Sequence, residues 1–338
     1  MNVFILGANG FIGSHLCEAI LTHTNWHITA IDLNQDKLAL LLQHERFNFR
    51  LGDITQETTW IKEAIASSDV VLPLVAIATP VTYVTNPLRV FELDFEANLA
   101  IVRLCVELQK RLIFPSTSEV YGMCQDDAFD EEHSHLVTGP VHKERWIYAT
   151  SKQLLDRLIY AYGKHKGLRY TLFRPFNWYG PRLDDITNPK PGGSRVLTQF
   201  IGNVMRAENI NLVNGGAQKR CFTYIDDGIA ALLRIIENKN EVASNRIFNI
   251  GNPDENLSIR SLAEKIVSLI NAHHPAYQAR AQAIELVSIE AGQYYGEGYQ
   301  DVSLRVPAIH AAQQHLQWQP TTSIDAGLRQ TLNFYLGN

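Results

Sequence analysis

The sequence predicts an α/β fold: a doubly wound parallel sheet, with helices on both faces and a smaller C-terminal lobe woven into it. Short apolar runs alternate with segments of helical spacing over the first half of the chain. The first apolar run stops at three glycines that stand directly before a helical pattern. After about residue 176 the even alternation breaks, which indicates the second lobe.

Composition limits the classes of function. A chain of 338 residues with 46% hydrophobic and 19% charged residues is typical of a large globular protein. The net charge of −5 supplies no basic field for nucleic acid. The apolar N-terminal run is too short for a membrane span and lacks a basic leader, so we expect a cytoplasmic protein with no membrane partner.

Cysteine and histidine spacing indicates no metal site. The four cysteines show no CxxC spacing, which also argues against a disulfide framework. His23 and His27 stand four residues apart, but they straddle the break between a predicted helix and a strand, with no third ligand nearby.

The first strand, residues 3–6, ends in a glycine turn, and Leu16, Ala19 and Ile20 then recur at helical spacing. Glycines here allow a tight turn, close approach of a pyrophosphate and close packing of helix on strand. A glycine triplet alone is weak evidence, but its place between strand and helix is the required one. We therefore predict a Rossmann-like cofactor site at Gly7, Gly10, Phe11, Ile12 and Gly13.

The second strand, residues 27–31, is followed by Asp32, about 20 residues beyond the last glycine. A carboxylate there accepts hydrogen bonds from the adenosine ribose and repels a 2′-phosphate, which favours NAD over NADP. The alternative is a solvent-exposed carboxylate at a strand end. The third strand, 47–51, is followed by Asp53 and Ile54, and we expect Asp53 to reach the adenine edge.

The fourth and fifth strands, 69–74 and 111–115, enclose a long helical pattern from about 87 to 108. The fifth strand delivers two hydroxyls and a carboxylate, Thr117, Ser118 and Glu119, to the sheet edge where ligands bind in open parallel sheets. Such groups can orient an alcohol and manage a proton. As an isolated string they can equally be a helix cap.

Tyr148 and Lys152 stand four residues apart, so on a helix they share one face. An ammonium beside a phenol stabilises the phenolate, and a tyrosine with a lowered pKa can take a proton from an alcohol while hydride leaves the same carbon. The alternative is an ordinary amphipathic helix that happens to carry both residues.

The second half of the chain divides between two units. A sixth strand at 169–173 and a helix and strand at 225–236 and 246–250 join the cofactor domain, which we place at residues 1–175 and about 222–253. The other lobe then comprises 176–221 and about 254–338. We expect it to contain a loop at 183–194, a helix at 196–205, strands near 211–213 and 218–223, a helix at 258–270, a loop at 294–301 and a helix from about 323.

Together these motifs resemble the extended short-chain dehydrogenase/reductases, which modify nucleotide sugars. The resemblance covers essentially the whole chain, and it is carried by the glycine turn, Tyr-x-x-x-Lys, and the segments 116–122 and 174–182. Within that family the sequence is most similar to ArnA-type UDP-glucuronic acid decarboxylases, through the strings at 72–80, 86–96, 115–124, 218–223 and 298–302. Those enzymes carry an N-terminal formyltransferase domain, whereas this sequence begins at the dehydrogenase strand, so formyl transfer is not expected.

The resemblance implies roles for individual residues. It assigns NAD to Asp32 and Asp53, and catalysis to Tyr148, Lys152, Thr117, Ser118, Glu119 and Arg305. It assigns the nucleotide sugar to Ala78, Tyr83, Thr117, Ser118, Arg145, Asn177, Arg195, Asn211, Gln218, Arg220 and Tyr299. Position 211 is Asn where those decarboxylases have Lys, which puts one nucleotide contact in doubt. For Arg305 the alternative is a salt-bridging arginine near a chain turn.

The implied activity is NAD-dependent oxidative decarboxylation of UDP-glucuronic acid to a UDP-4-keto-pentose and CO2. A second hypothesis is that the ketone is reduced again with retained NADH, giving UDP-xylose or UDP-apiose. Ser118, where plant UDP-apiose/xylose synthases have Cys, favours the first. A third is a non-catalytic nucleotide-sugar sensor, which would have no reason to keep both Tyr148 and Lys152. We expect a homodimer paired through the apolar helices after Pro87 and around Tyr148.

Overall fold

The computed structural model describes residues 1–187, 194–296, 298–300, 302 and 304–337. The predicted loops at 183–194 and 294–301 lie partly outside the described residues.

The centre of the molecule is a seven-stranded sheet in which every neighbouring pair is parallel. Its order is β11-β6-β5-β4-β1-β2-β3, so the chain starts in the middle and builds outward in both directions. This confirms the predicted doubly wound sheet, and the strand order reverses beside β1, the point at which such sheets bind ligands. The strands are β1 Asn2–Leu6, β2 His27–Asp32, β3 Phe47–Leu51, β4 Val70–Pro73, β5 Arg111–Pro115, β6 Tyr170–Pro175 and β11 Arg246–Ile250.

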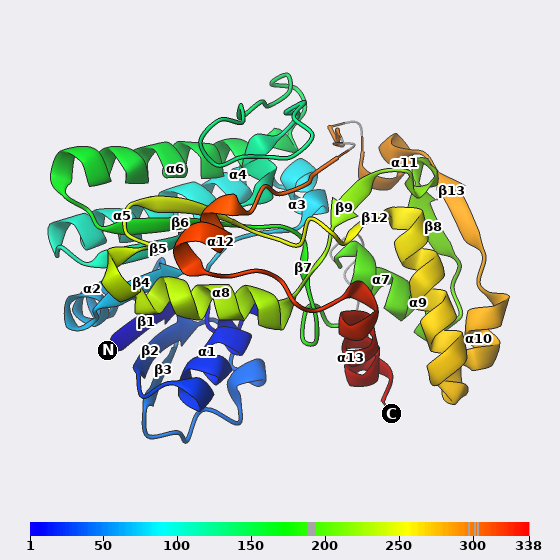
Figure 1. Ribbon diagram of the computed structural model, residues 1–338, viewed down its shortest axis with the longest axis horizontal. Coiled ribbons are helices and arrows are strands. Elements are labelled where there is room, and N and C mark those ends of the chain that lie inside the picture. Colours follow the sequence, from blue (N-terminus) through cyan, green and yellow to red (C-terminus); the bar gives the residue numbers. More distant parts are fainter. Residues whose placement is uncertain (188–193, 297, 301, 303, 338) are drawn as a thin grey trace.

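Helices cover both faces of the sheet (Figure 1). Alternate residues of a strand point to opposite faces, and in β1 all are apolar and buried: Val3 and Ile5 pack in one cluster, Phe4 and Leu6 in another. The first cluster lies under α1 (Phe11–His23) and α8 (Ile225–Glu237). The second lies under α2 (Thr58–Ser67), α5 (Asn98–Glu107) and α6 (Trp146–Lys166).

The predicted long helix from 87 to 108 is present but not uniform. It consists of α4 (Pro87–Phe91), a π-helical turn over Glu92–Ala97, and α5. Asn86 caps its start by accepting a hydrogen bond from the Arg89 N–H, and Pro87 occupies the first helical position, where no donor is needed. A π turn inside an α-helix is rare and is found mostly at functional sites.

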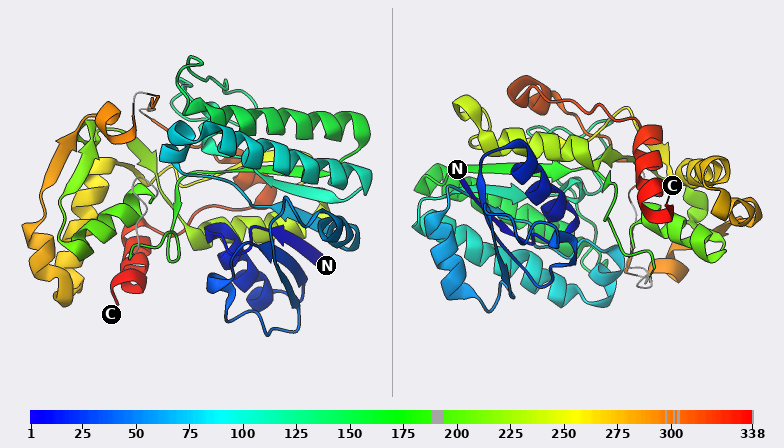
Figure 2. Two further views of the ribbon diagram at one scale, coloured as in Figure 1. Left: turned by 180° about the vertical axis from the view of Figure 1, so that it is seen from behind. Right: turned by 90° about the horizontal axis from the view of Figure 1, so that it is seen from below.

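The smaller lobe sits at one end of the sheet, as the views in Figures 1 and 2 show. Its strands pair in twos: β8 with β13, and β9 with β12. Its core is continuous with the cluster under α1 and α8. Its elements are α7 Val196–Arg206, β8 Ile210–Val213, β9 Lys219–Cys221, β12 Asn256–Ser258, α9 Ile259–His273, α10 Gln278–Ala283, β13 Leu286–Ile289, α11 Ala291–Tyr295 and α13 Ile324–Leu336.

One stretch that we expected in the smaller lobe returns to the sheet. Helix α12 (His310–Leu316) contacts α8 and β11. Arg234 of α8 donates to the carbonyl of Leu316 at 2.9 Å, and the Trp318 indole donates to the carbonyl of Asp227, also at 2.9 Å. The chain after residue 304 therefore crosses from the smaller lobe back to the larger one.

No described helix is both long and apolar enough to cross a membrane. The four cysteines are buried and unbridged. Over the same described residues, no group of three or more His, Cys, Asp or Glu side chains is placed to hold a metal ion.

Candidate active site between the two lobes

A cleft of about 430 Å³ lies at the carboxyl ends of the central strands and reaches the smaller lobe. Its lining comes from the glycine turn after β1, from the segments after β4 and β5, from α6, and from β8 and β9 of the smaller lobe. All of the site residues predicted from the sequence line this cleft except Asp32, Asp53 and Ile54.

The cofactor end is built on the glycine turn. Gly7 has φ +84°, a conformation that favours glycine, and a Cβ on Gly13 would stand 2.3 Å from the Gly7 carbonyl oxygen. Helix α1 starts here with Gly10 as its N-cap and no acidic residue in its first turn. Its free backbone N–H groups and positive dipole end suit a pyrophosphate, so these residues fit a dinucleotide.

Asp32 ends β2 beside this turn. Its carboxylate accepts hydrogen bonds from the backbone N–H groups of Asn9 (2.8 Å) and Asn34 (3.2 Å). Burial raises the pKa of Asp32, and the backbone donors counteract this. Asp53 follows β3 and accepts from the backbone and hydroxyl of Thr55, both at 2.8 Å, which lowers its pKa. Ile54 packs against the core under α2.

Tyr148 and Lys152 lie on α6 and are buried. The Lys152 ammonium donates to the Pro115 carbonyl at 3.1 Å, so the end of β5 holds it in place. The Tyr148 ring stacks on Tyr83, with centroids 4.7 Å apart and planes 7° apart. Both phenols therefore face the cleft side by side.

Without a bound cofactor, the surroundings of Tyr148 raise the pKa of its phenol. Burial raises the pKa of Tyr148, and the carboxylates of Asp94 and Glu119 raise it further. A side-chain hydrogen bond with Thr117 acts in the opposite direction. A positive charge that a ligand brings next to the phenol would lower this pKa.

The string after β5 forms a helix cap, and its residues also lie at the cleft. The Thr117 hydroxyl accepts from the Glu119 N–H at 3.1 Å and so caps the 3-10 turn Ser118–Tyr121. Thr117, Ser118 and Glu119 also line the cleft.

Glu119 lies between two buried arginines. Its carboxylate accepts from Arg145 at 2.5 Å through one oxygen and from Arg305 through the other. Arg145 is 2% exposed and Arg305 is 5% exposed. Burial alone would raise the pKa of Glu119, but the two guanidiniums lower it to about 2. Arg305 therefore forms a salt bridge, as the alternative interpretation from the sequence expected. Its partner, however, is a carboxylate that lines the cleft.

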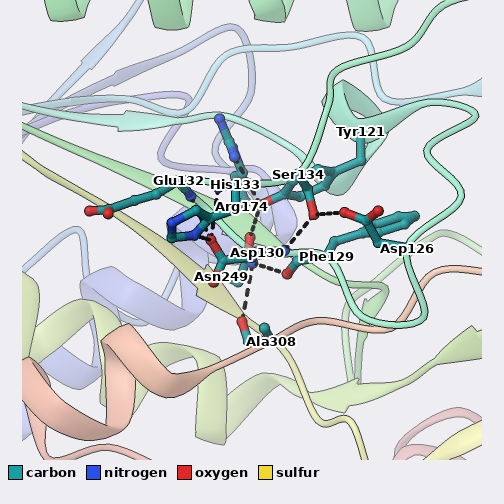
Figure 3. A network of polar contacts seen from close by, with 10 residues as sticks. All are labelled: Tyr121, Asp126, Phe129, Asp130, Glu132, His133, Ser134, Arg174, Asn249 and Ala308. Atoms are coloured by element: carbon teal, nitrogen blue, oxygen red, sulfur yellow. Dashed lines mark hydrogen bonds and ion pairs between the residues drawn. The ribbon is translucent and has the colours of Figure 1, made fainter.

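A polar network positions the chain beside Arg305 (Figure 3). Asn249, on β11, donates to the carbonyls of Phe129 (2.8 Å) and Ala308 (3.1 Å), and accepts from the Tyr121 hydroxyl at 2.8 Å. The Phe129 N–H donates to the Val306 carbonyl at 2.7 Å. The loop before α6 and the segment carrying Arg305 are thus both fixed to the same strand.

The smaller lobe contributes the remaining predicted residues. Arg195, the N-cap of α7, forms an ion pair of 2.6 Å with Asp184. Asn177 has φ +40°, and its amide donates to the Cys221 carbonyl at 3.0 Å. The Tyr299 ring lies 5.4 Å from the Arg145 guanidinium. The other lining residues of this side that the sequence predicted are Asn211, Gln218 and Arg220.

Two features escaped the sequence analysis. Gln199 donates to the Tyr294 hydroxyl, and both line the cleft. Asp94, in the π turn, is fully buried with Oδ1 4.0 Å from the Lys152 ammonium. The sequence does contain a signal for Asp94: it is an acidic residue on the apolar stripe of a predicted helix, four positions before Asn98.

Known proteins share this architecture. The sequence model of the NAD dependent epimerase/dehydratase family matches residues 3–251. The crystal structure of the PbgP3 protein from Burkholderia pseudomallei is 53% identical with a TM-score of 0.90, over 100% of this chain and 96% of that one. UDP-glucuronic acid 4-epimerase from Bacillus cereus, solved with UDP-glucuronic acid and NAD, is 25% identical with a TM-score of 0.81, over 99% and 98%. The chain belongs to the NAD-dependent epimerase/dehydratase family of extended short-chain dehydrogenase/reductases, and NAD is its cofactor.

Proposed function

We propose that this protein catalyses NAD-dependent oxidative decarboxylation of UDP-glucuronic acid to a UDP-4-keto-pentose and CO2. The observation that carries the proposal is the buried cluster of Arg145, Glu119 and Arg305 in the cleft that also holds Tyr148 and Lys152. Within this triad two guanidiniums face one carboxylate, so these three side chains by themselves carry one positive charge at a site where burial makes charge costly. The carboxylate of a glucuronic acid would neutralise it.

The charged side chains elsewhere in the cleft support a nucleoside diphosphate as the other part of the substrate. Arg195 and Arg220 lie on the smaller-lobe side of the cleft, and the planar fork of a guanidinium matches phosphate oxygens. Gln218 and Asn211 lie on the same side and offer neutral donors to a base or ribose. The Bacillus cereus 4-epimerase, a relative bound to UDP-glucuronic acid, supports the same substrate.

The oxidation requires removal of a proton and a hydride from one carbon. NAD+, when bound, accepts the hydride. Tyr148 takes the proton of the 4-hydroxyl, and Thr117 holds the phenol through their hydrogen bond. Lys152 is a buried cation that lines the same cleft, and its hydrogen bond to the Pro115 carbonyl fixes its position.

The decarboxylation follows from the ketone. The new 4-ketone is β to the carboxylate, so the electrons of the breaking C–C bond flow into the ketone oxygen as CO2 leaves. Hydroxyls of Thr117 and Ser118 donate hydrogen bonds to that oxygen and stabilise the enolate. Arg305 orients a water that returns a proton to the carbon, because a guanidinium itself does not give one up. The proton that Tyr148 removed from the 4-hydroxyl returns to the water that protonated the carbon, so no net proton is released. Glu119 holds Arg305 in place for this step through their ion pair.

The test is one incubation of pure protein with NAD+ and UDP-glucuronic acid, in which NADH absorbance, CO2 release and the sugar product are followed together. The proposal expects CO2 and a 4-keto-pentose in equal amounts. CO2 with UDP-xylose and no net NADH would assign the re-reducing alternative. Formation of the 4-epimer without CO2 would refute decarboxylation.

A pair of variants tests whether Tyr148 is the catalytic base. Tyr148→Phe keeps the ring that stacks on Tyr83 and loses only the hydroxyl, so NADH formation should fall by at least about 100-fold. Tyr160→Phe makes the same change at a 54% exposed position of the same helix and should leave the rate unchanged. Equal rates for the two variants would remove Tyr148 from the mechanism.

We also propose that the protein is a homodimer. Leu88 on α4 and Leu154 and Tyr160 on α6 are exposed apolar side chains, and α4 contacts α6. Pairing across a two-fold axis would cover them. Sedimentation that shows only monomer would contradict the proposal.

A further inference from the structure

Asp94 occupies an unusual position for a carboxylate. It lies in the π-helical turn, fully buried, on the stripe that otherwise packs Val90 and Val102 into the interior. One oxygen, Oδ2, accepts a hydrogen bond of 2.9 Å from the Ile77 N–H, in the segment after β4. Among the described residues, the other oxygen has no hydrogen-bond partner. A buried carboxylate oxygen left in this state is costly unless a nearby charge compensates it.

The compensating charge is Lys152. Its ammonium is 4.0 Å from Asp94 Oδ1, and both side chains are almost completely buried. Burial lowers the pKa of Lys152, because an ammonium in a dry site is disfavoured, while the carboxylates of Asp94 and Asp156 raise it. Asp156 already pairs with Arg174 at 3.0 Å and accepts from the Ser116 hydroxyl at 2.8 Å. Of these two carboxylates, Asp156 is paired with an arginine, whereas among the described residues Asp94 forms an ion pair with Lys152 alone.

The π turn is tied to the strand segment that ends in the cleft. The Asn98 amide donates to the carbonyls of Val75 (3.1 Å) and Leu93 (3.0 Å). Together with the Ile77 bond, this fixes the Asp94 backbone and one carboxylate oxygen, so the second oxygen has little freedom. Asp94 is rigid before any ligand binds.

We propose that Asp94 is a positioning residue for Lys152: its carboxylate keeps the buried ammonium charged and holds it beside the reacting end of the cleft. The inference deepens the proposed function, since it rests on the role of Lys152 beside Tyr148 in the oxidation. The ammonium has three donors, of which Pro115 takes one. Asp94 faces the ammonium at ion-pair distance, and the remaining donors are available to the bound reactants.

Two variants separate a charge role from a structural one. Asp94→Asn keeps the size of the side chain and an acceptor for the Ile77 N–H, and removes only the charge. Glu96→Gln makes the same chemical change at an exposed position of the same π turn. If Asp94 only satisfied the Ile77 N–H, both variants would behave as the parent protein.

The first measurement needs no substrate. In protein labelled with 15N at the lysine Nζ, the Lys152 signal is assigned by its loss in Lys152→Met, and its pKa is followed by titration. In Asp94→Asn this pKa should fall by about one unit or more, since an opposite charge at about 4 Å has that effect on a buried group. Glu96→Gln should leave it in place. An unchanged Lys152 titration in Asp94→Asn overturns the inference.

The second measurement is the rate of NAD+ reduction on mixing with UDP-glucuronic acid. Asp94→Asn should slow it by at least about tenfold while the KM values for both substrates stay within about twofold. Burial raises the pKa of Asp94 to about 6 despite Lys152 and the Ile77 N–H. Below that pH the parent carboxyl is neutral like Asn, so the ratio of parent to variant rates should grow as pH rises through about 6.

Other titratable groups also lie near Asp94 and Lys152. They are Tyr148 and Asp156 on α6, Tyr83 on α3 (Pro80–Thr85), and Glu119 in the turn after β5. Asp94 raises the pKa of Tyr83 and of Tyr148, so both pKa values should fall in Asp94→Asn, and the lysine titration is the measurement that reports on Lys152 alone. A ratio that is constant with pH would contradict a charge role. If the parent protein does not oxidise UDP-glucuronic acid at all, the proposed function fails, and the lysine titration still decides the role of Asp94.

Discussion

Replacing Glu119 by Gln should destabilise the protein in a pH-dependent way. The pKa of Glu119 falls from its ordinary 4.5 to about 2 in the folded chain. Each pKa unit corresponds to about 1.4 kcal/mol, so the ionised carboxylate contributes about 3 kcal/mol to the free energy of unfolding at neutral pH. Its side chain is only 17% exposed, so solvent screens little of this. Glu119→Gln would also remove this negative charge from beside Arg145 and Arg305.

The sign of the pH effect follows from the lowered pKa. The folded state holds the proton less tightly than the unfolded chain, so the stabilisation is complete above the unfolded pKa of about 4.5 and is lost as pH falls toward about 2. Urea unfolding of parent and variant at several pH values measures it. The gap should be about 3 kcal/mol at pH 7 and should close as the solution becomes acidic.

A matched control makes the result specific. Glu132→Gln makes the same change at an exposed position of the loop before α6 and should change the free energy of unfolding by less than about 0.5 kcal/mol. A Glu119→Gln gap that is small, or that stays constant down to acid pH, would refute the reasoning. The arginines would then be compensated by something other than this carboxylate.

Two further substitutions test other parts of the site. Gly13→Ala places a Cβ 2.3 Å from the Gly7 carbonyl, so NAD+ affinity measured by calorimetry should fall at least about tenfold, whereas Gly292→Ala, where a Cβ meets nothing within 4 Å, should not change it. Asn249→Ala removes the hydrogen bonds that Asn249 makes with Tyr121, Phe129 and Ala308, so the free energy of unfolding should fall by about 2–4 kcal/mol. The rate of CO2 release should fall by a larger factor than the affinity for NAD+. Equal losses in both quantities would contradict the role of Asn249 near Arg305.

The sheet could be predicted from the sequence because its signals are local. Each strand is an apolar run, and the glycine turn directly after Leu6 predicts which edge of the sheet binds the cofactor. The place of α12 could not be predicted, since its sequence allows packing on either lobe and only the contacts of Arg234 and Trp318 decide between them.

The residues of the candidate site also fall into those that local patterns predict and those that only packing brings together. Residues in short motifs, such as Thr117 to Glu119, were found because their spacing is fixed by one turn. Asp94 was missed because its importance depends on Lys152, which is distant in sequence and comes close only through packing. The effect of burial on the pKa of Tyr148 could not be predicted, because no local pattern reports how deeply the phenol is buried.

The return of the chain from the smaller lobe to the sheet has a consequence for biosynthesis. The glycine turn and Tyr148 leave the ribosome early, and a domain can begin to fold as it emerges. Arg305 lies on the returning segment, far later in the sequence. This segment is anchored through Val306 to Phe129 in the loop before α6, and through Ala308 to Asn249 of β11. A nascent chain would therefore acquire its dinucleotide pocket before its positive cluster, and would be unable to start the proposed reaction until translation had passed this segment.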